Sequence, residues 1–224
     1  MATNNEQLAD LMNLTSGDKK HDPSAYSTLD VLTVLYDRIL NYDASNPQSE
    51  DRDRFIMSKG HGPLVLYAIL AQKGFFPARE LSRFLEWDGI LGGHPDRKRV
   101  PGVEASTGSL GHGFPMAIGV ALGLKAKRID RRVYVLIGDG ETNEGSVWEA
   151  VLLAGNLSLS NLTAILIDNR SSSRDLGDIA TKFKAFGWQA DTVDGRDEDA
   201  IENALLSPAL ERPSLVVAEV LTNG

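Results

Sequence analysis

The chain contains 224 residues, 42% of them hydrophobic and 24% charged, a balance typical of a globular protein with one large or two small domains. Its net charge of −8 disfavours general binding to nucleic acids or anionic membranes, which require patches of lysine and arginine. The absence of cysteine excludes disulfides, thiol catalysis and cysteine-ligated zinc. The polar N-terminus lacks a signal-peptide pattern, and no apolar run approaches the roughly 18 residues of a membrane helix, so we predict a soluble cytoplasmic protein.

The first half of the chain predicts helices separated by long loops. Residues 27–40 predict a helix that Ser27 caps, with Asp30 three positions on as in a capping box and an apolar face that begins at Leu29. The other expected elements are a strand at 54–58, a helix that Pro63 opens and Gly74 closes, loops rich in glycine, proline and histidine at 89–113, and a helix at 115–127.

The second half predicts a regular alternation of strands and helices. Strands are expected at 133–137, 163–167, 189–193 and 214–220, and helices at 145–157, 179–186 and 197–206. Most of these strands are apolar on both faces, which is typical of a parallel sheet that helices cover on both sides. We therefore predict an α/β fold with a mostly parallel sheet and helices on both faces, forming one domain over residues 1–224.

Two polar residues follow neighbouring strands of this predicted sheet. Asp139 comes just after the strand at 133–137, and Asn169 comes just after the strand at 163–167. One helix separates them, so the strands should be parallel and both residues should lie at the carboxyl edge, where open α/β sheets bind ligands. A carboxylate and an amide oxygen suit Mg²⁺ or Ca²⁺ whose remaining ligands are diphosphate oxygens and water.

The glycines on either side of Asp139 fit a bulky anion. Gly138 and Gly140 place no side chain in its way, and the helix expected from about residue 145 should direct its free N–H groups toward the same edge. A tight strand-to-helix turn would also explain these glycines, and for the three residues 138–140 alone it is the better interpretation. Asn169 at the end of the second strand favours a metal–diphosphate site.

Several motifs in order resemble those of one family. The run GDGETNEGSVWEA at 138–150, followed by NLTAILIDN at 161–169, is similar to the thiamine-diphosphate motif of transketolases. The other matching runs, in the family's order, are SKGHG at 58–62, GGHP at 92–95, PGVEASTGSLGHG at 101–113, AFGW at 185–188 and VDGRD at 193–197. The resemblance covers nearly the whole chain and implies the diphosphate-binding domain of the thiamine-diphosphate-binding fold.

The resemblance implies a set of cofactor ligands. The side chains of Asp139 and Asn169 and the backbone carbonyl of Ser171 would bind Mg²⁺ or Ca²⁺. Gly108 and Leu110 match loop positions that line the cofactor. The cofactor would be thiamine diphosphate.

Three further residues match family positions at the active site. His61 and His94 match histidines near the diphosphate and the reacting sugar carbons, and both lie in glycine-rich loops, where functional residues concentrate. Glu144 matches an acid that links cofactor sites across the subunit interface, although it could simply be a favourable charge at a helix start. His112 fits a packing role and a functional role equally well.

Two segments depart from the family pattern. Transketolases usually carry a Ser-Gly-His run before the first long helix, but Asp18 stands here where the histidine would be, and His21 is an uncertain substitute. Residues 170–173, which follow Asn169, are more polar than the family's usual sequence beside the thiazolium ring.

The family's second half has no counterpart in this sequence. The glutamate that activates the cofactor's pyrimidine ring lies on a second α/β domain, and a further active-site histidine lies beyond the last strand expected here. We therefore expect a split enzyme that transfers a two-carbon ketol unit between sugars or sugar phosphates. Its partner would be a C-terminal transketolase-like subunit with the pyrimidine-binding domain, in an α₂β₂ assembly.

Two alternatives stay open at this point. The α subunit of a 2-oxoacid dehydrogenase, or of an acyloin-forming enzyme, uses the same cofactor and a similar motif, although residues 58–62 and 92–95 look more like transketolase. A non-catalytic homologue is the other, with Asp18 in its favour and intact Asp139 and Asn169 against it. A nicotinamide-binding fold is disfavoured because no clear strand precedes the glycine-rich run at 108–113.

Overall fold

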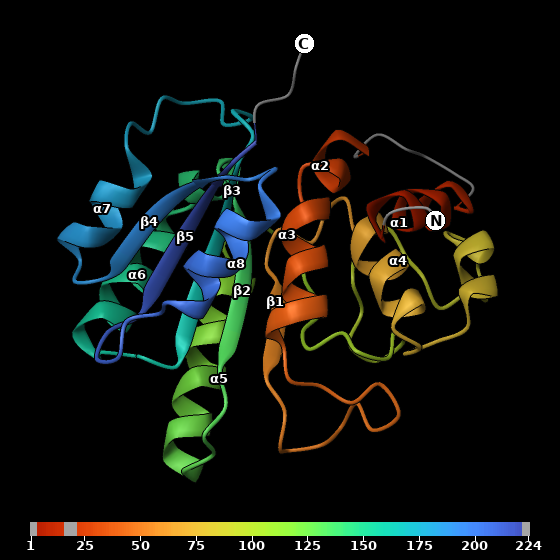
Figure 1. Ribbon diagram of the computed structural model, residues 1–224, viewed down its shortest axis with the longest axis horizontal. Coiled ribbons are helices and arrows are strands. Elements are labelled where there is room, and N and C mark those ends of the chain that lie inside the picture. The colour runs from red at the N-terminus through yellow and green to blue at the C-terminus, as the bar shows by residue number, and fades with distance from the viewer. Residues whose placement is uncertain (1–3, 16–21, 221–224) are drawn as a thin grey trace.

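A five-stranded parallel sheet forms the centre of the molecule (Figure 1). The computed structural model describes residues 4–15 and 22–220. The strands, in the spatial order β1-β2-β3-β5-β4, are β1 Arg54–Met57, β2 Val133–Gly138, β3 Leu162–Asp168, β5 Ser214–Glu219 and β4 Gln189–Asp194. All neighbouring pairs are parallel, so the predicted α/β class and sheet type are confirmed.

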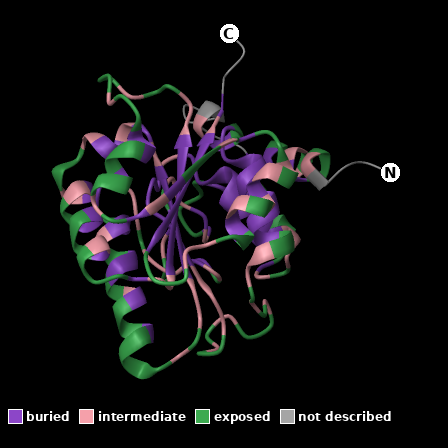
Figure 2. Cartoon of the chain, turned by 60° about the vertical axis from the view of Figure 1, so that its left-hand side comes forward, coloured by how far each residue is buried: buried purple, intermediate pink, exposed green. Residues whose placement is uncertain are grey.

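Helices cover both faces of the sheet, in agreement with the sequence-based prediction. The hydrophobic core on one side of the sheet includes residues of α3 Leu29–Val34, the π-helix η1 Leu35–Ile39, α4 Leu64–Gln72 and α8 Glu198–Leu206. Three further elements, α1 Asn4–Asn13, α2 Asp22–Tyr26 and the 3₁₀ helix η2 Ala78–Arg83, extend this core and pack against α4. The other face packs against α5 Gly113–Lys127, α6 Gly145–Asn156 and α7 Ile179–Ala185. Figure 2 shows the buried strands between these two helical layers.

Strand β3 shows why the strands are apolar throughout. Ile165 and Ile167 point into the core on the α4 and α8 side, whereas Ala164 and Leu166 point into the core on the α5 and α6 side. Successive side chains of a strand point to opposite faces, so a sheet that is buried on both faces requires apolar residues at every position.

The helix predicted at 27–40 differs from the expectation at both ends. The regular α-helix begins at Leu29 and gives way to the π-helix at Leu35. Ser27 does not cap it, because its hydroxyl donates to the carbonyl of Ser24 at 2.9 Å. The capping box is also wrong, since Asp30 accepts hydrogen bonds from Asn5 and Arg196 rather than from the helix start. Ser27 is thus bound to a neighbouring turn, whereas Asp30 is bound to partners distant in sequence.

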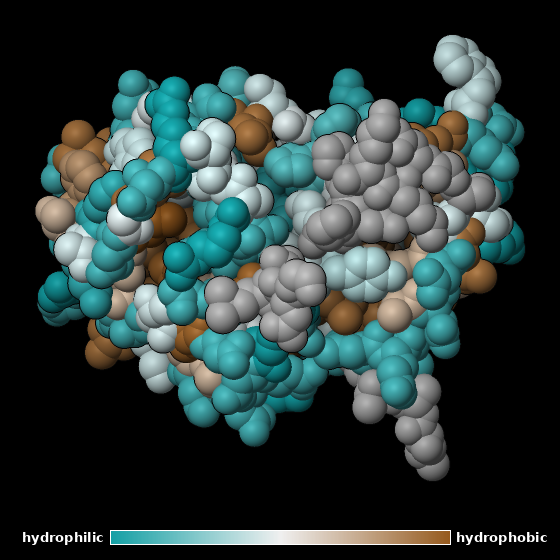
Figure 3. Space-filling view, turned by 90° about the horizontal axis from the view of Figure 1, so that it is seen from above, coloured by the Kyte–Doolittle hydropathy of each residue, from teal (hydrophilic) through white to brown (hydrophobic). Residues whose placement is uncertain are grey.

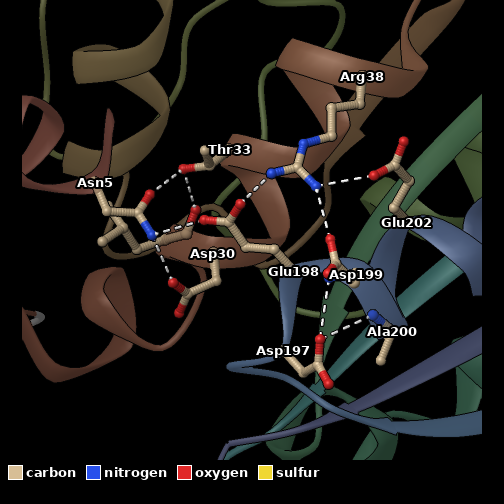
Figure 4. A network of polar contacts seen from close by, with 10 residues as sticks. Asn5, Asp30, Thr33, Arg38, Asp197, Glu198, Asp199, Ala200 and Glu202 are labelled. Carbon is tan, nitrogen blue, oxygen red and sulfur yellow. Dashed lines mark hydrogen bonds and ion pairs between the residues drawn. The ribbon is translucent and has the colours of Figure 1, made fainter. Parts of the chain in front are cut away.

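A network of charges joins α8 to the N-terminal helices (Figure 4). Arg38 contacts Glu198 and also Glu202, whose carboxylate lies 2.8 Å from its guanidinium. Asn5 donates to both Asp30 and Glu198, at 2.8 and 3.2 Å. These contacts hold α1 and η1 against a helix that lies about 160 or more positions later in the chain.

Helix α1 is an element that the sequence interpretation missed. It is short, and it buries only Leu8 and Met12 completely, which lie four positions apart on one face. The positions of Asp18 and His21, which depart from the family pattern, lie outside the described residues. Among the described residues, no helix is both long and apolar enough to cross a membrane.

Candidate active site

The carboxyl edge of the sheet brings Asp139 and Asn169 together. Strands β2 and β3 are direct neighbours, with Gly138 opposite Ile167, and the backbone N–H of Asp139 extends the ladder by donating to the carbonyl of Ile167 at 2.9 Å. Both residues line one pocket of about 440 Å³ at this edge, which is at the top in Figure 1. Seen from that end, hydrophilic side chains form most of the coloured surface (Figure 3).

Most of the predicted site residues line this pocket, and three do not. Those that line it are His61, Leu110, Gly138, Asp139, Gly140, Asn169 and Ser171. Gly108, His94 and Glu144 are not among the residues that line it. The structure therefore gathers the proposed metal ligands and one histidine in a single hollow, and places the other three residues beside it.

Ser171 connects the two side chains proposed as metal ligands. Its hydroxyl donates to Asp139 Oδ1 at 2.7 Å, and its backbone N–H donates to Asn169 Oδ1 at 3.2 Å. Asp139 Oδ1 also accepts from the N–H of Gly140, whereas Oδ2 accepts only from the N–H of Ser172 among the described residues. Because each carboxylate oxygen can accept about two such bonds, Oδ2 keeps an acceptor position for a cation.

The donor set suits a hard divalent cation. The carboxylate of Asp139 and the amide oxygen of Asn169 are oxygen ligands of the type that Mg²⁺ and Ca²⁺ prefer. No group of three or more histidine, cysteine, aspartate or glutamate side chains that could hold a metal occurs among the described residues. A cation here would therefore need amide or carbonyl oxygens of the chain and external oxygens to complete its shell, and a diphosphate could supply those external oxygens.

The space around Gly140 suits a bulky anion. A β-carbon built on Gly140 would meet no atom within 4 Å, and one on Gly138 would meet only the side chain of Lys59 at 3.4 Å. The helix expected from about residue 145 begins there, as α6, but it does not follow Asp139 directly. A 3₁₀ turn, η3 Gly140–Asn143, comes first, and its residues rather than the start of α6 line the pocket.

Two charged residues of this pocket were not singled out from the sequence. Lys59 is buried, and its ammonium donates to the hydroxyl and the carbonyl of Ser24 at 2.8 and 3.0 Å. Burial lowers the pKa of Lys59 to about 8, although the charges of Asp139 and Glu141 act in the opposite direction. The lysine lies within the run 58–62 that was matched to the family, so its position beside a histidine was an available signal.

Glu141 is the second of these residues. Its side chain is buried at the base of the pocket, and Oε1 accepts hydrogen bonds from the Ser58 hydroxyl and from the N–H of Gly111 at 2.9 Å. Burial raises the pKa of Glu141, and its hydrogen bonds and the charge of Lys59 oppose that rise. No local pattern identifies this residue, because its partners lie 30 and 83 positions away.

The three residues outside the pocket flank it. His94 is exposed, and its ring lies against Gly108, where a β-carbon would come within 2.8 Å of the imidazole. Glu144 is exposed at the start of α6 and makes no side-chain cap there. Because this carboxylate is exposed and is not used as a helix cap, it is accessible to another protein chain. His112 is also exposed, with Nδ1 3.1 Å from the carbonyl of Leu110.

Comparisons with known proteins connect this geometry to one family. The family model described as "Transketolase, thiamine diphosphate binding domain" matches residues 9–222. The chain is 36% identical to the 6-deoxy-6-sulfo-D-fructose transketolase subunit SqwG of Clostridium sp. strain MSTE9, over 90% of this chain and 76% of that protein. It is also 36% identical to an apulose-4-phosphate transketolase subunit of Actinobacillus succinogenes, over 93% and 78% respectively.

A third relative carries a different kind of name. The chain is 45% identical to the protein named Ferredoxin fas2 of Rhodococcoides fascians, over 96% of this chain and 71% of that protein. Iron–sulfur clusters of ferredoxins are held by cysteine thiolates, and this chain contains no cysteine. The region of the present chain that matches this relative therefore has no cysteine ligands for such a cluster.

The solved structures agree with the sequence comparisons. Transketolase from Leishmania mexicana superposes with a TM-score of 0.82 at 28% identity, over 98% of this chain but 37% of that one. The present chain thus spans little more than a third of a full-length transketolase. Because the family model matches nearly the whole chain and the transketolase subunits match over most of their length, this chain belongs to the transketolase family, as its thiamine-diphosphate-binding domain.

Proposed function

We propose that this chain is the diphosphate-binding subunit of a two-chain transketolase, which transfers a two-carbon ketol unit between sugars or sugar phosphates. The single observation that carries the proposal is the pocket in which Asp139 and Asn169, at the ends of neighbouring strands, are joined through Ser171. Two relatives are named as transketolase subunits, which supports the two-chain arrangement.

The residues of the pocket would divide the work of holding thiamine diphosphate. Asp139, Asn169 and the carbonyl of Ser171 would hold Mg²⁺ or Ca²⁺, which in turn would bind the diphosphate. The open space at Gly140 leaves the backbone accessible to the anion, and Leu110 supplies an apolar wall. When bound, the cofactor would supply the nucleophilic carbon that carries the ketol unit.

The histidines and Glu144 would serve the substrate and the partner. His61 lies in the pocket, where its imidazole could hydrogen-bond the diphosphate or a sugar hydroxyl. The exposed ring of His94 stacks against Gly108 at the side, in a position to meet a substrate that enters from solvent. Glu144 would contact a neighbouring subunit, because it is exposed at the start of α6 and its carboxylate makes no N-cap hydrogen bond there.

The partner in this proposal is a C-terminal transketolase-like subunit. It would carry the pyrimidine-binding domain and the glutamate that activates the cofactor, in an α₂β₂ assembly with the cofactor between the two kinds of subunit. This division predicts that neither chain alone catalyses ketol transfer, because each would hold only one end of the cofactor.

The decisive experiment measures ketol transfer with the separate and combined chains. The reading frame next to this one is the first place to seek the partner, and a chain of ordinary domain size or larger is expected there. We expect no activity from this chain alone, and activity with ketose donors once the partner, thiamine diphosphate and Mg²⁺ are added. Robust activity without a partner would contradict the two-chain proposal.

The same assay distinguishes the alternative activities. Turnover of 2-oxoacids in place of ketose donors by the assembled enzyme would identify a 2-oxoacid dehydrogenase or acyloin-forming activity instead. Calorimetry that detects no thiamine diphosphate binding to the complex would identify a non-catalytic homologue. The intact oxygen ligands at Asp139 and Asn169 argue against that second outcome.

A further inference from the structure

The loop that precedes α5 carries two of the proposed cofactor residues but has no regular secondary structure of its own. Gly108 and Leu110 lie in this loop, between η2 and α5. Side-chain contacts hold it at both ends. Thr107 donates to the carbonyl of Met57 at 2.7 Å, and Ser146 donates to the carbonyl of Gly111 at 2.8 Å. A loop without ladder hydrogen bonds depends on such contacts for its position.

Glu141 accepts the only hydrogen bond that the N–H of Gly111 makes within the described residues. The distance from that N–H to Oε1 is 2.9 Å, and the same oxygen accepts the hydroxyl proton of Ser58, at the end of β1. With Glu141 itself following β2, one carboxylate oxygen joins three segments. Glu141 is 1% exposed, so these bonds are shielded from water in the folded chain, and an unpaired donor there is costly.

The surroundings of Gly111 leave this loop little freedom to find another position. Gly111 has a φ of +78°, in the left-handed region that favours glycine. A β-carbon there would lie 2.4 Å from Ser146 Oγ and 2.7 Å from Glu144 Cβ, so the backbone passes directly over the start of α6. The backbone at Gly111 is thus packed closely against the start of α6, and Glu141 accepts the hydrogen bond of its N–H.

We propose that Glu141 is a positioning residue of the active site, which fixes the loop at 107–112 and the end of β1 relative to the Gly138–Asp139–Gly140 turn. The three segments that it joins carry Leu110, His61 and Asp139, all of which line the pocket. Glu141 acts through the N–H of Gly111 and the hydroxyl of Ser58, and needs no contact with substrate. The inference rests on the proposed function only for the identity of the cofactor.

A carboxylate suits this position better than an apolar side chain. Two donors, the Ser58 hydroxyl and the Gly111 N–H, converge on one buried point and would each lose a partner if the acceptor were absent. A negative charge also faces Lys59, whose ammonium is buried nearby. Replacement of Glu141 by alanine should therefore release the loop, whereas glutamine should retain much of the anchoring because its carbonyl oxygen can accept both donors.

The test measures amide hydrogen exchange in the folded chain and cofactor affinity in the complex with its partner. In the wild type, the Gly111 amide should be protected. In Glu141→Ala it should exchange at least about 10-fold faster, a change worth about 1.4 kcal/mol, and calorimetry should show a comparable loss of affinity for thiamine diphosphate with Mg²⁺. Glu141→Gln should recover most of both properties.

Asp197→Ala is the matched control, since it removes the N-cap of α8, which accepts from the N–H groups of Asp199 and Ala200. It should lower global stability by about 1 kcal/mol without a local change at Gly111. Wild-type exchange at Gly111 in Glu141→Ala, or fast exchange there in the wild type, would overturn the proposal. So would faster loop exchange with unchanged cofactor affinity.

The wild-type measurements separate this inference from the proposed function. If the wild-type complex binds no thiamine diphosphate but Gly111 is protected and is released in Glu141→Ala, the proposed function fails and the anchoring of the loop stands. If Glu141→Ala does not fold, the wild-type exchange rate at Gly111 and the behaviour of Glu141→Gln still decide the question. A Glu141→Gln variant with a fully released loop would contradict the role of the shared acceptor oxygen.

Discussion

Two groups of acidic side chains in this molecule accept hydrogen bonds from different kinds of partner. At the end of β2, Asp139 and Glu141 accept hydrogen bonds from backbone N–H groups and serine hydroxyls. Between α8 and the N-terminal helices, the carboxylates of Glu198 and Glu202 pair with Arg38 (Figure 4). The second group is satisfied by full positive charges, and the first group is not.

This difference separates a binding site from a structural ion-pair cluster, called the clamp below, that Arg38 forms with Glu198 and Glu202. A carboxylate paired with a guanidinium has its charge balanced, so it gains little from a metal ion. Asp139 receives only neutral donors, and Lys59, a cation of the same pocket, directs its hydrogen bonds to Ser24. The negative charge at the end of β2 is therefore available to a divalent cation. Four predictions test the contrast, in order of decreasing effect.

Asp139→Asn should nearly abolish metal-dependent cofactor binding. Asparagine keeps the size and one acceptor oxygen but removes the charge, so we expect affinity for thiamine diphosphate with Mg²⁺ to fall by more than about 100-fold, because even outer-shell partners of metal ligands cost roughly 10- to 100-fold. Calorimetry on the complex with its partner measures the change. Asp197→Asn, the same substitution at a helix cap where asparagine serves equally well, should leave binding unchanged.

Lys59 should make the stability of the metal-free chain rise with pH in the alkaline range. Its folded pKa of about 8 lies below the unfolded value of about 10.5, so between these values the unfolded state binds the proton and the folded state does not. Relative to Lys59→Met, the wild type should therefore gain on the order of 2 to 3 kcal/mol as pH rises from 8 toward 10.5. Urea unfolding of both proteins in chelator measures this difference, and parallel pH profiles would refute it.

Asn169→Ala should weaken cofactor binding less than the change at Asp139. The amide is a neutral ligand, so its loss removes one oxygen and the hydrogen bond from Ser171 but leaves the charge of the site intact. We expect roughly a 10-fold lower affinity for thiamine diphosphate with Mg²⁺, which corresponds to about 1.4 kcal/mol. A loss as large as that of Asp139→Asn would show that charge is not the dominant contribution, and would remove the distinction between the two acidic groups.

Arg38→Ala should affect stability slightly and binding not at all. Its partners Glu198 and Glu202 are about one-third exposed, so water can solvate them when the guanidinium is removed. Partly exposed ion pairs contribute about 0.2 to 1 kcal/mol each, and we expect a loss of about 1 kcal/mol in urea unfolding. Altered affinity for thiamine diphosphate in this variant would mean that the clamp and the site are coupled.

The strands and the two residues at their ends were predictable because their signals are local. Buried apolar runs located the strands at 133–137 and 163–167 to within about one residue. A single intervening helix makes the two strands parallel, which places Asp139 and Asn169 at one edge before any coordinates are known. The geometry of the pocket agrees with that placement, whereas the roles of the individual residues stay predictions.

The errors of the sequence interpretation fall where distant partners decide the local structure. Ser27 and Asp30 have the spacing of a capping box, but Asp30 contacts Asn5 and Arg196 instead. Asn5 lies 25 positions and Arg196 lies 166 positions from Asp30 in the chain. This outcome does not follow from propensity, because such tertiary contacts outweigh the small energy of a helix cap.

The fold class, the parallel sheet and the edge at which Asp139 and Asn169 meet follow from the amino-acid sequence, because hydrophobic period and strand order act over short distances along the chain. The residues that surround that edge do not follow from it. In the folded chain, Lys59 is buried near Asp139 and Glu141, and the Glu141 carboxylate accepts the N–H of Gly111. His94 and Glu144 lie outside the pocket. Those relationships join segments tens of residues apart, and packing rather than local pattern fixes them.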